Sequence, residues 1–142
     1  MDEPVLSYSH DGLHDQLTHC AAPPVFYSHV NRVIAASVRS GTPLTLVAIS
    51  LPPNSHTEEV LQMAHILNQV MRKDEVCGRL GNLQFVLALT GTLNSAQLMI
   101  QRVKKASAQP FNSALVQWRT GESSLELFYR LDIEETASKL EK

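Results

Sequence analysis

Two short runs of this chain carry side chains whose types and spacing bear on chemistry. In the first, Arg72-Lys73-Asp74-Glu75, an arginine precedes a carboxylate by three positions. A guanidinium is a planar fork of donors that can bind phosphate oxygens in a bidentate way, and a carboxylate accepts hydrogen bonds from N–H groups. The same spacing also suits an i,i+3 ion pair at an exposed helix end, worth only about 0.3 kcal/mol. The run by itself leaves both interpretations open.

The second run is Gly81-Asn82-Leu83-Gln84-Phe85. Gly81 and Asn82 both tolerate positive φ, so the pair suits the turn of a β-hairpin. Leu83 is apolar and Gln84 is neutral, and therefore neither side chain binds Mg²⁺ well or accepts a proton. Phosphoryl transfer needs carboxylates that hold metal ions against the phosphates. This turn is not equipped for that reaction.

The spacing of apolar residues predicts the elements that must position these runs. Residues 1–14 have no period and are expected to form a loose arm. The expected elements after them are a helix over 25–40, a strand over 44–51, a helix from Ser55 or Thr57 to about Lys73, strands over 76–80 and 84–89, a helix from Asn94 or Ser95 to about Ala106, a strand over 113–118 and a last helix after Ser123 or Ser124. Gly41-Thr42-Pro43 is expected to end the first helix.

Composition limits the class of protein. The chain has 142 residues, of which 44% are hydrophobic and 18% charged, as in one folded domain with a sizeable core. The formal net charge of −2 argues against a broad nucleic-acid surface. The longest apolar stretch, residues 43–53, is too short to cross a bilayer, and Asp2, Glu3 and Pro4 replace a basic leader. We therefore expect a cytoplasmic protein without membrane insertion.

Cysteine and histidine give weak signals. Cys20 and Cys77 lack a C-x-x-C spacing, and in a reducing compartment we expect buried thiols rather than a disulfide. His10 and His14 have the i,i+4 spacing of a zinc-binding pair. The arm that carries them has no helix-stabilising pattern, and no metal site is expected.

Five stretches in order resemble the GGDEF family of nucleotide cyclases. They are Asp15-Gln16-Leu17-Thr18 with Phe26, residues 43–50, Met63-Ala64-His65-Ile66-Leu67, residues 72–85 and residues 131–139. The resemblance covers roughly residues 15–142 and implies an α/β fold, the cyclase-like sandwich, in which helices flank a central, mostly antiparallel sheet of about five strands. Residues 1–14 would be an arm or linker, and residues 15–142 a degenerate GGDEF-like domain.

The resemblance also implies that catalysis has been lost. The family carries a metal-binding Asp at the position of Ser50 and its signature acids at those of Leu83 and Gln84. The interval from Ser50 to Gly81 is shorter than usual and lacks the loop that presents guanine-reading residues. The chain is accordingly expected to be no enzyme, with no catalytic residue and no cofactor. A noncanonical cyclase is the remaining alternative, and it would have to place two metal ions on these neutral side chains.

The resemblance further implies a ligand site, because residues of the family's inhibitory site have counterparts in this chain. Many family members bind the product cyclic di-GMP at an inhibitory Arg-x-x-Asp site, whose position here is taken by Arg72 and Glu75. A second family arginine corresponds to Arg102. Guanidinium groups can bind phosphate or the O6 and N7 edge of guanine, and Glu75 can accept from guanine N1 and N2. Asp74 and Arg79 are further candidates, although Arg79 could instead have a structural role beside the turn.

The resemblance thus predicts a catalytically inactive bacterial signalling domain, of the kind that regulates biofilms, which binds cyclic di-GMP through Arg72, Glu75 and Arg102. It would relay the signal to a protein partner or a second copy of the chain. The alternative is a ligand-free module for protein docking or dimerisation. An exposed apolar patch would favour that alternative.

Overall fold

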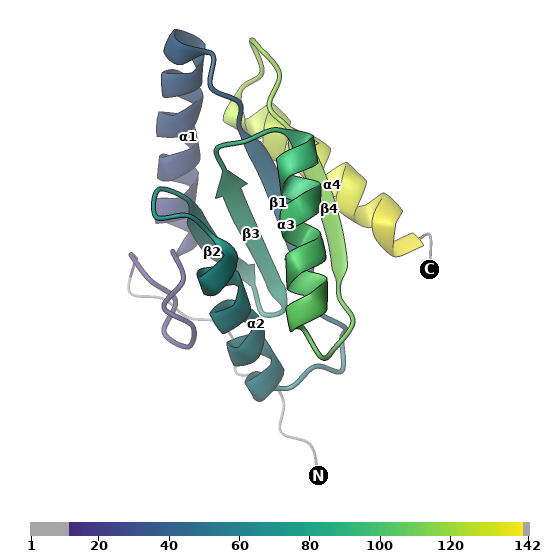
Figure 1. Cartoon of the computed structure of the whole chain (residues 1–142). Coiled ribbons are helices and arrows are strands. Elements are labelled where there is room, and N and C mark those ends of the chain that lie inside the picture. Colours follow the sequence, from purple (N-terminus) through teal and green to yellow (C-terminus); the bar gives the residue numbers. More distant parts are fainter. Residues whose placement is uncertain (1–11, 141–142) are drawn as a thin grey trace.

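The structure is a computed structural model and describes residues 12–140 (Figure 1). Residues 1–11, which include His10 and most of the expected arm, lie outside the described residues. The elements are α1 (Pro23–Ser40), β1 (Thr45–Ser50), α2 (Thr57–Val70), β2 (Val76–Gly81), β3 (Gln84–Leu89), α3 (Leu93–Ala106), β4 (Asn112–Gln117) and α4 (Ser124–Leu140). Their order is the one that the apolar periodicity predicts.

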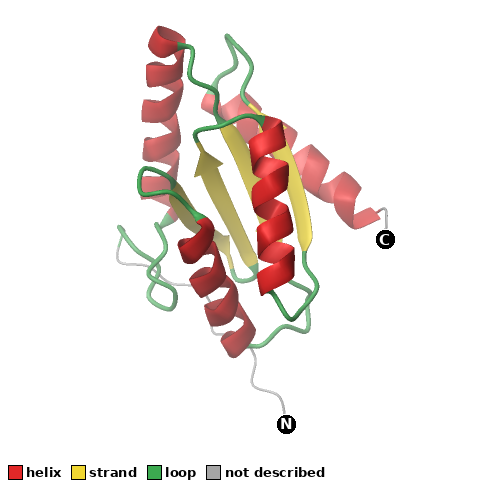
Figure 2. Ribbon diagram, in the orientation of Figure 1, coloured by secondary structure: helices red, strands yellow, loops and turns green. Residues whose placement is uncertain are grey.

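The strands form one sheet in the order β2-β3-β1-β4, and all neighbouring pairs are antiparallel (Figure 2). The described residues thus give four strands, against the count of about five that the resemblance implied. β1 lies between β3 and β4, with Val47 opposite both Leu87 and Leu115. All six residues of β1 are buried, because helices cover both faces of the sheet.

Two helices cover each face. The side chains of Val47 and Ile49 on β1 pack into a core with residues of α2 and α3, whereas those of Leu46 and Ala48 pack into a second core with residues of α1 and α4. This alternation follows from the period of two in a strand. Among the described residues, no helix is long and apolar enough to cross a membrane.

The segment before α1, residues 12–22, lies along the outer edge of β2 (Figure 1). The backbone N–H of Ala21 donates to the carbonyl of Cys77 (3.0 Å), and the N–H of Arg79 donates to the carbonyl of Ala21 (3.2 Å). Ala21 thereby forms a parallel bridge with Gly78, and it also forms an antiparallel bridge with His14. The segment covers an edge that would otherwise expose unpaired backbone groups.

Candidate ligand site

Three of the predicted ligand residues meet at one pocket. The turn between α2 and β2 contributes Arg72 and Glu75, and the last turns of α3 contribute Arg102. The pocket has a volume of about 100 Å³ and is also lined by Thr90 and Ser95. We call it the arginine pocket. Residues that lie 30 positions apart in the chain are thus brought together by the packing of α2 and α3 on one face of the sheet.

Glu75 shapes the turn that carries Arg72. Its Oε1 accepts a hydrogen bond from the backbone N–H of Arg72 (2.8 Å), and its own N–H donates to the Arg72 carbonyl (3.1 Å). Its Oε2 accepts from the N–H of Thr90 at the end of β3 (3.3 Å). No ion pair joins the Arg72 and Glu75 side chains within residues 12–140. The simple i,i+3 ion pair is therefore not what this run forms; the carboxylate fixes the turn and leaves the guanidinium available.

Both arginines of the arginine pocket are exposed. In the described part of the chain, neither guanidinium makes a hydrogen bond or an ion pair. The arginine pocket combines two guanidinium groups with the one carboxylate of Glu75, and this excess of positive charge favours a negatively charged ligand. Ser95 and Thr90 add hydroxyl groups to the pocket wall, and these can donate to phosphate oxygens.

The other two candidates lie elsewhere. Asp74 is exposed, accepts a long hydrogen bond from the Thr90 hydroxyl (3.4 Å) and does not line the arginine pocket. Arg79 is completely buried; its Nη1 donates to both carboxylate oxygens of Asp15 (3.1 Å each) and its Nη2 to the carbonyl of Asn82 (2.7 Å). Arg79 therefore has no exposed surface to offer a ligand, and its candidacy as a ligand residue stays a prediction. Arg79 ties the hairpin turn to the segment before α1, which is the structural role left open from the sequence.

At positions 50 and 84, where the resemblance places acids, the structure has two neutral side chains that hydrogen-bond one carboxylate. Ser50 and Gln84 lie opposite each other in the register of β1 and β3. The Ser50 hydroxyl donates to Oε2 of Glu135, and the Gln84 amide donates to its Oε1 (2.8 Å) and Oε2 (3.0 Å). Glu135 comes from α4 and is 8% exposed. Donors from both neighbours already occupy the carboxylate oxygens that a metal ion would need.

Sequence reasoning missed Glu135, although a signal was present. Leu127 and Leu131 are the buried apolar residues of α4, and Glu135 continues their i,i+4 spacing. An acid on the buried face of a helix needs polar partners, and here Ser50 and Gln84 supply them. This donor set of one hydroxyl, one amide and one carboxylate offers a single anionic group to a metal ion. Within residues 12–140, no group of three or more His, Cys, Asp or Glu side chains could hold a metal ion.

Comparisons with known proteins show the fold. No family model matches the sequence, and no curated protein matches it. Solved structures do match. The GGDEF domain of DgcB from Caulobacter crescentus, in complex with c-di-GMP, superposes with a TM-score of 0.82 at 16% identity, covering 93% of this chain and 90% of that one. The GGDEF domain of TpbB from Pseudomonas aeruginosa gives 0.78 at 12% identity, covering 91% and 90%.

A third similar structure is the diguanylate cyclase SiaD from Pseudomonas aeruginosa in complex with its activator SiaC. It gives a TM-score of 0.80 at 18% identity and covers 90% of this chain and 58% of that one. The expected fold class is thus confirmed: the chain has the fold of a GGDEF domain.

Proposed function

We propose that this chain, with its GGDEF-domain fold, is a catalytically inactive receptor that binds cyclic di-GMP at the arginine pocket and passes the signal to a partner protein. The observation that carries the proposal is the meeting of Arg72, Glu75 and Arg102 at one pocket, where neither guanidinium group has a partner among residues 12–140. A structural neighbour, the GGDEF domain of DgcB, has been crystallised with the same nucleotide. The ligand's chemistry also fits, because it combines phosphates with guanine edges.

The size of the pocket determines how the ligand would bind. A cavity of about 100 Å³ is well below the roughly 300–1,000 Å³ of sites that enclose a whole small molecule. One guanine edge or one phosphate would therefore enter the pocket, and the rest of the nucleotide would lie on the surface. Each oxygen of Glu75 already accepts one backbone hydrogen bond and keeps a further lone pair. The carboxylate can then accept from guanine N1 or N2 without releasing the turn.

Titration calorimetry with cyclic di-GMP tests the receptor function. We expect micromolar binding, about −8 kcal/mol, which Arg72→Ala and Arg102→Ala each weaken at least about tenfold by removing a charge-assisted contact. Arg39→Ala is the matched control, because Arg39 is an exposed arginine on α1, which covers the opposite face of the sheet. Binding that is absent in the parent protein, or equally strong in all three variants, would refute a receptor at this pocket.

Inactivity rests on the buried network of Ser50, Gln84 and Glu135. These side chains offer a single carboxylate, whereas metal-assisted nucleotide condensation needs acids that hold two ions against the triphosphate. We expect no cyclic product from GTP with Mg²⁺ or Mn²⁺ above a protein-free blank. Product formation by the purified protein, lost on Glu135→Gln, would identify a noncanonical cyclase instead.

A specific observation also favours the second candidate, a docking or dimerisation module without a nucleotide. Leu125, Tyr129 and Ile133 follow one another at i,i+4 spacing on α4 and are 80%, 67% and 50% exposed. Exposed apolar residues in a contiguous stripe are typical of contact surfaces. The opposite side of α4 carries Leu127 and Leu131, which are buried in the core. This helix therefore presents apolar residues on both of its sides.

Sedimentation at several protein concentrations distinguishes the two candidates. If α4 mediates dimerisation, Tyr129→Glu converts a dimer into a monomer without lowering the stability of the fold, because Tyr129 is exposed. Arg72→Ala should then leave association unchanged. A protein that binds cyclic di-GMP and sediments as the same monomer before and after Tyr129→Glu would support the receptor without α4 dimerisation.

A further inference from the structure

A second site lies where the segment before α1 runs along β2. Ala21 is paired in parallel with Gly78 through an isolated bridge, so the residues that precede them, Cys20 in the loop before Ala21 and Cys77 on β2, lie side by side. Adjacent strands are about 4.8 Å apart, which is within the Cα separation of about 4.4–6.8 Å that a disulfide spans. The two cysteines therefore meet the first geometric requirement for a covalent link.

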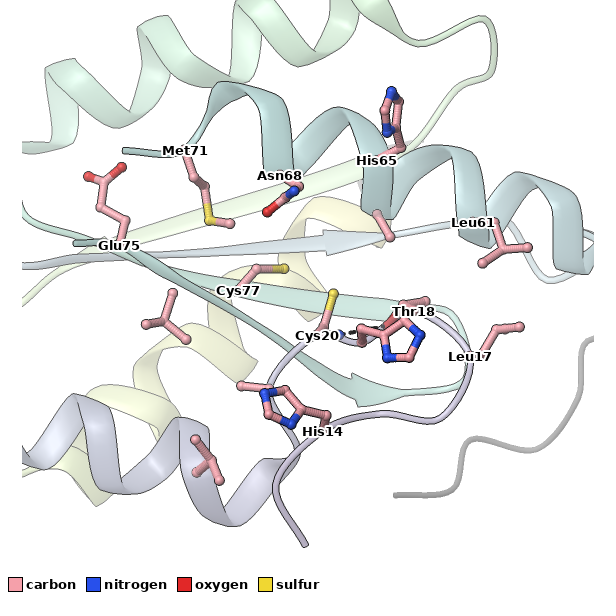
Figure 3. Close-up of a pocket in the computed structure, with 15 residues that line it drawn as sticks. His14, Leu17, Thr18, Cys20, Leu61, His65, Asn68, Met71, Glu75 and Cys77 are labelled. Atoms are coloured by element: carbon pink, nitrogen blue, oxygen red, sulfur yellow. Dashed lines mark hydrogen bonds between the residues drawn. The ribbon is translucent and has the colours of Figure 1, made fainter. Parts of the chain in front are cut away.

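The side chains meet the second requirement, which is direction. In Figure 3 the sulfur atoms of Cys20 and Cys77 point toward each other inside a pocket between the segment and α2. This thiol pocket, lined by both cysteines, has a volume of about 640 Å³. Both thiols are free in the structure; Cys77 is buried, whereas Cys20 is half-buried. A small reagent that enters the thiol pocket can therefore reach Cys20.

The two thiols differ in acidity. A hydrogen bond from the Cys77 thiol, followed by a weaker one from Thr18, lowers the pKa of Cys20, although burial opposes the shift. The same hydrogen bond and burial raise the pKa of Cys77 well above its ordinary value. Cys77 is buried whereas Cys20 is half-buried, so a reagent in the thiol pocket reaches Cys20 first, and the lowered pKa of Cys20 favours the reactive thiolate form there.

We propose that Cys20 and Cys77 are a reversible redox modification site, which a low-molecular-weight hydroperoxide oxidises to an intramolecular disulfide. The Cys20 thiolate attacks the outer peroxide oxygen, the O–O bond breaks, and the alkoxide leaves and takes up a proton, so that Cys20 becomes a sulfenic acid. The Cys77 sulfur then attacks the Cys20 sulfur, and the hydroxyl group leaves with the Cys77 proton as water. Two thiols lose two electrons and two protons, and the peroxide is reduced to an alcohol and water.

The site would control how firmly the segment before α1 is attached to the sheet. In the reduced protein, the segment is held on β2 by backbone hydrogen bonds and by the pairing of Asp15 with Arg79. The disulfide adds a covalent bond at the same edge, directly beside strand β2, which leads into the hairpin turn at Asn82. Glu75 lines both the thiol pocket and the arginine pocket, so the two sites are neighbours.

Mass spectrometry and thiol counting on the whole chain test the proposal. These are the only two cysteines in the sequence, so an intramolecular disulfide has a single possible assignment. With one equivalent of hydrogen peroxide, we expect the mass to fall by two hydrogens, both free thiols to disappear, and dithiothreitol to restore them. We also expect the midpoint of thermal unfolding to rise by several degrees on oxidation, because the bond restricts the unfolded chain. A fall in the midpoint would show a strained bond and overturn the proposal.

Two variants assign the roles of the thiols. Cys77→Ser should stop at the sulfenic acid of Cys20, which dimedone traps, and Cys20→Ser should slow the oxidation of the remaining thiol at least about tenfold because Cys77 is buried and burial disfavours its thiolate. Both variants are nearly isosteric, and their thermal unfolding checks that the fold is kept. Oxygen addition without a cross-link in the parent protein, disulfides only between chains, or equal reactivity of the two thiols would each contradict the proposal.

Discussion

Breaking the buried pair of Asp15 and Arg79 should destabilise this fold more than changing any exposed arginine. Both side chains are fully buried, and Arg79 donates to the two carboxylate oxygens and to the carbonyl of Asn82. Arg79→Met removes the cation, and among residues 12–140 the buried Asp15 carboxylate then keeps only the Thr18 N–H (2.8 Å) and hydroxyl (2.7 Å) as hydrogen-bond donors to its side chain. The cost of leaving one charge of a buried pair uncompensated is about 3–5 kcal/mol.

Urea unfolding of Arg79→Met measures this cost directly, and thermal unfolding should show a fall of roughly 10–15 °C for a chain of this length. The double variant Asp15→Asn with Arg79→Met no longer buries an unpaired charge, so its loss should be smaller than the sum of the two single losses by about 1–3 kcal/mol. Arg32→Met is the control, because Arg32 is exposed and donates to the exposed Ser28 hydroxyl rather than to a buried charge.

The reasoning would be refuted in two ways. A loss below about 1 kcal/mol in Arg79→Met, close to that of the Arg32 control, would mean that the pair behaves like an exposed surface pair. Strict additivity in the double variant would mean that Asp15 and Arg79 do not act through each other, and that their separate contacts with Thr18 and Asn82 account for the stability.

Two further outcomes follow from local geometry. A Cβ atom at Gly78 would lie 2.8 Å from the ring of the fully buried Phe26, so Gly78→Ala should lower the free energy of unfolding in urea by about 1–3 kcal/mol. Gly81→Ala on the same strand is the control, because its Cβ would have its nearest contact at 3.6 Å, and it should lower the free energy of unfolding clearly less. Equal losses in the two variants would contradict the packing argument. Burial, and to a lesser degree the nearby Arg32, lowers the pKa of His29 in the fold. The unfolded chain therefore takes up the proton at higher pH, and stability that is intact above about pH 6.5 should fall as the pH drops below it. His29→Gln should flatten the thermal midpoint between pH 7.5 and 5.5, and an unchanged slope would exclude His29 as the cause.

Local patterns predicted the elements well but not their ends. The apolar periods predicted every helix and strand in order, and Gly41 ends α1 in the left-handed conformation, as expected for a residue without a side chain. The residues at which the helices begin were predicted less accurately. Ser123 does cap α4, but α3 begins after Thr92, whose hydroxyl accepts from the Ser95 N–H, rather than at the expected Asn94 or Ser95. A cap depends on the path of the preceding loop, which the sequence alone does not specify.

At the candidate site too, the sequence predicted which residues matter but not which contacts they make. The resemblance pointed to Arg72, Glu75 and Arg102 as ligand residues, and the structure brings all three to one pocket. The resemblance could not foresee that Glu75 would fix the turn by backbone hydrogen bonds instead of pairing with Arg72. It also treated Arg79 as a candidate ligand residue, because nothing in a short run reveals a partner 64 positions away.

The sequence by itself determined which side chains alternate between core and surface, and that neutral residues stand at positions 50, 83 and 84. These properties are local, since the period of a helix or strand depends only on neighbouring residues. Tertiary structure alone decided which charges meet. It buried Arg79 against Asp15, surrounded Glu135 with Ser50 and Gln84, and brought the guanidinium groups of Arg72 and Arg102 to one pocket. The physical reason is that the energy of a charge depends on its burial and on the groups around it, and both are set by the packing of distant segments.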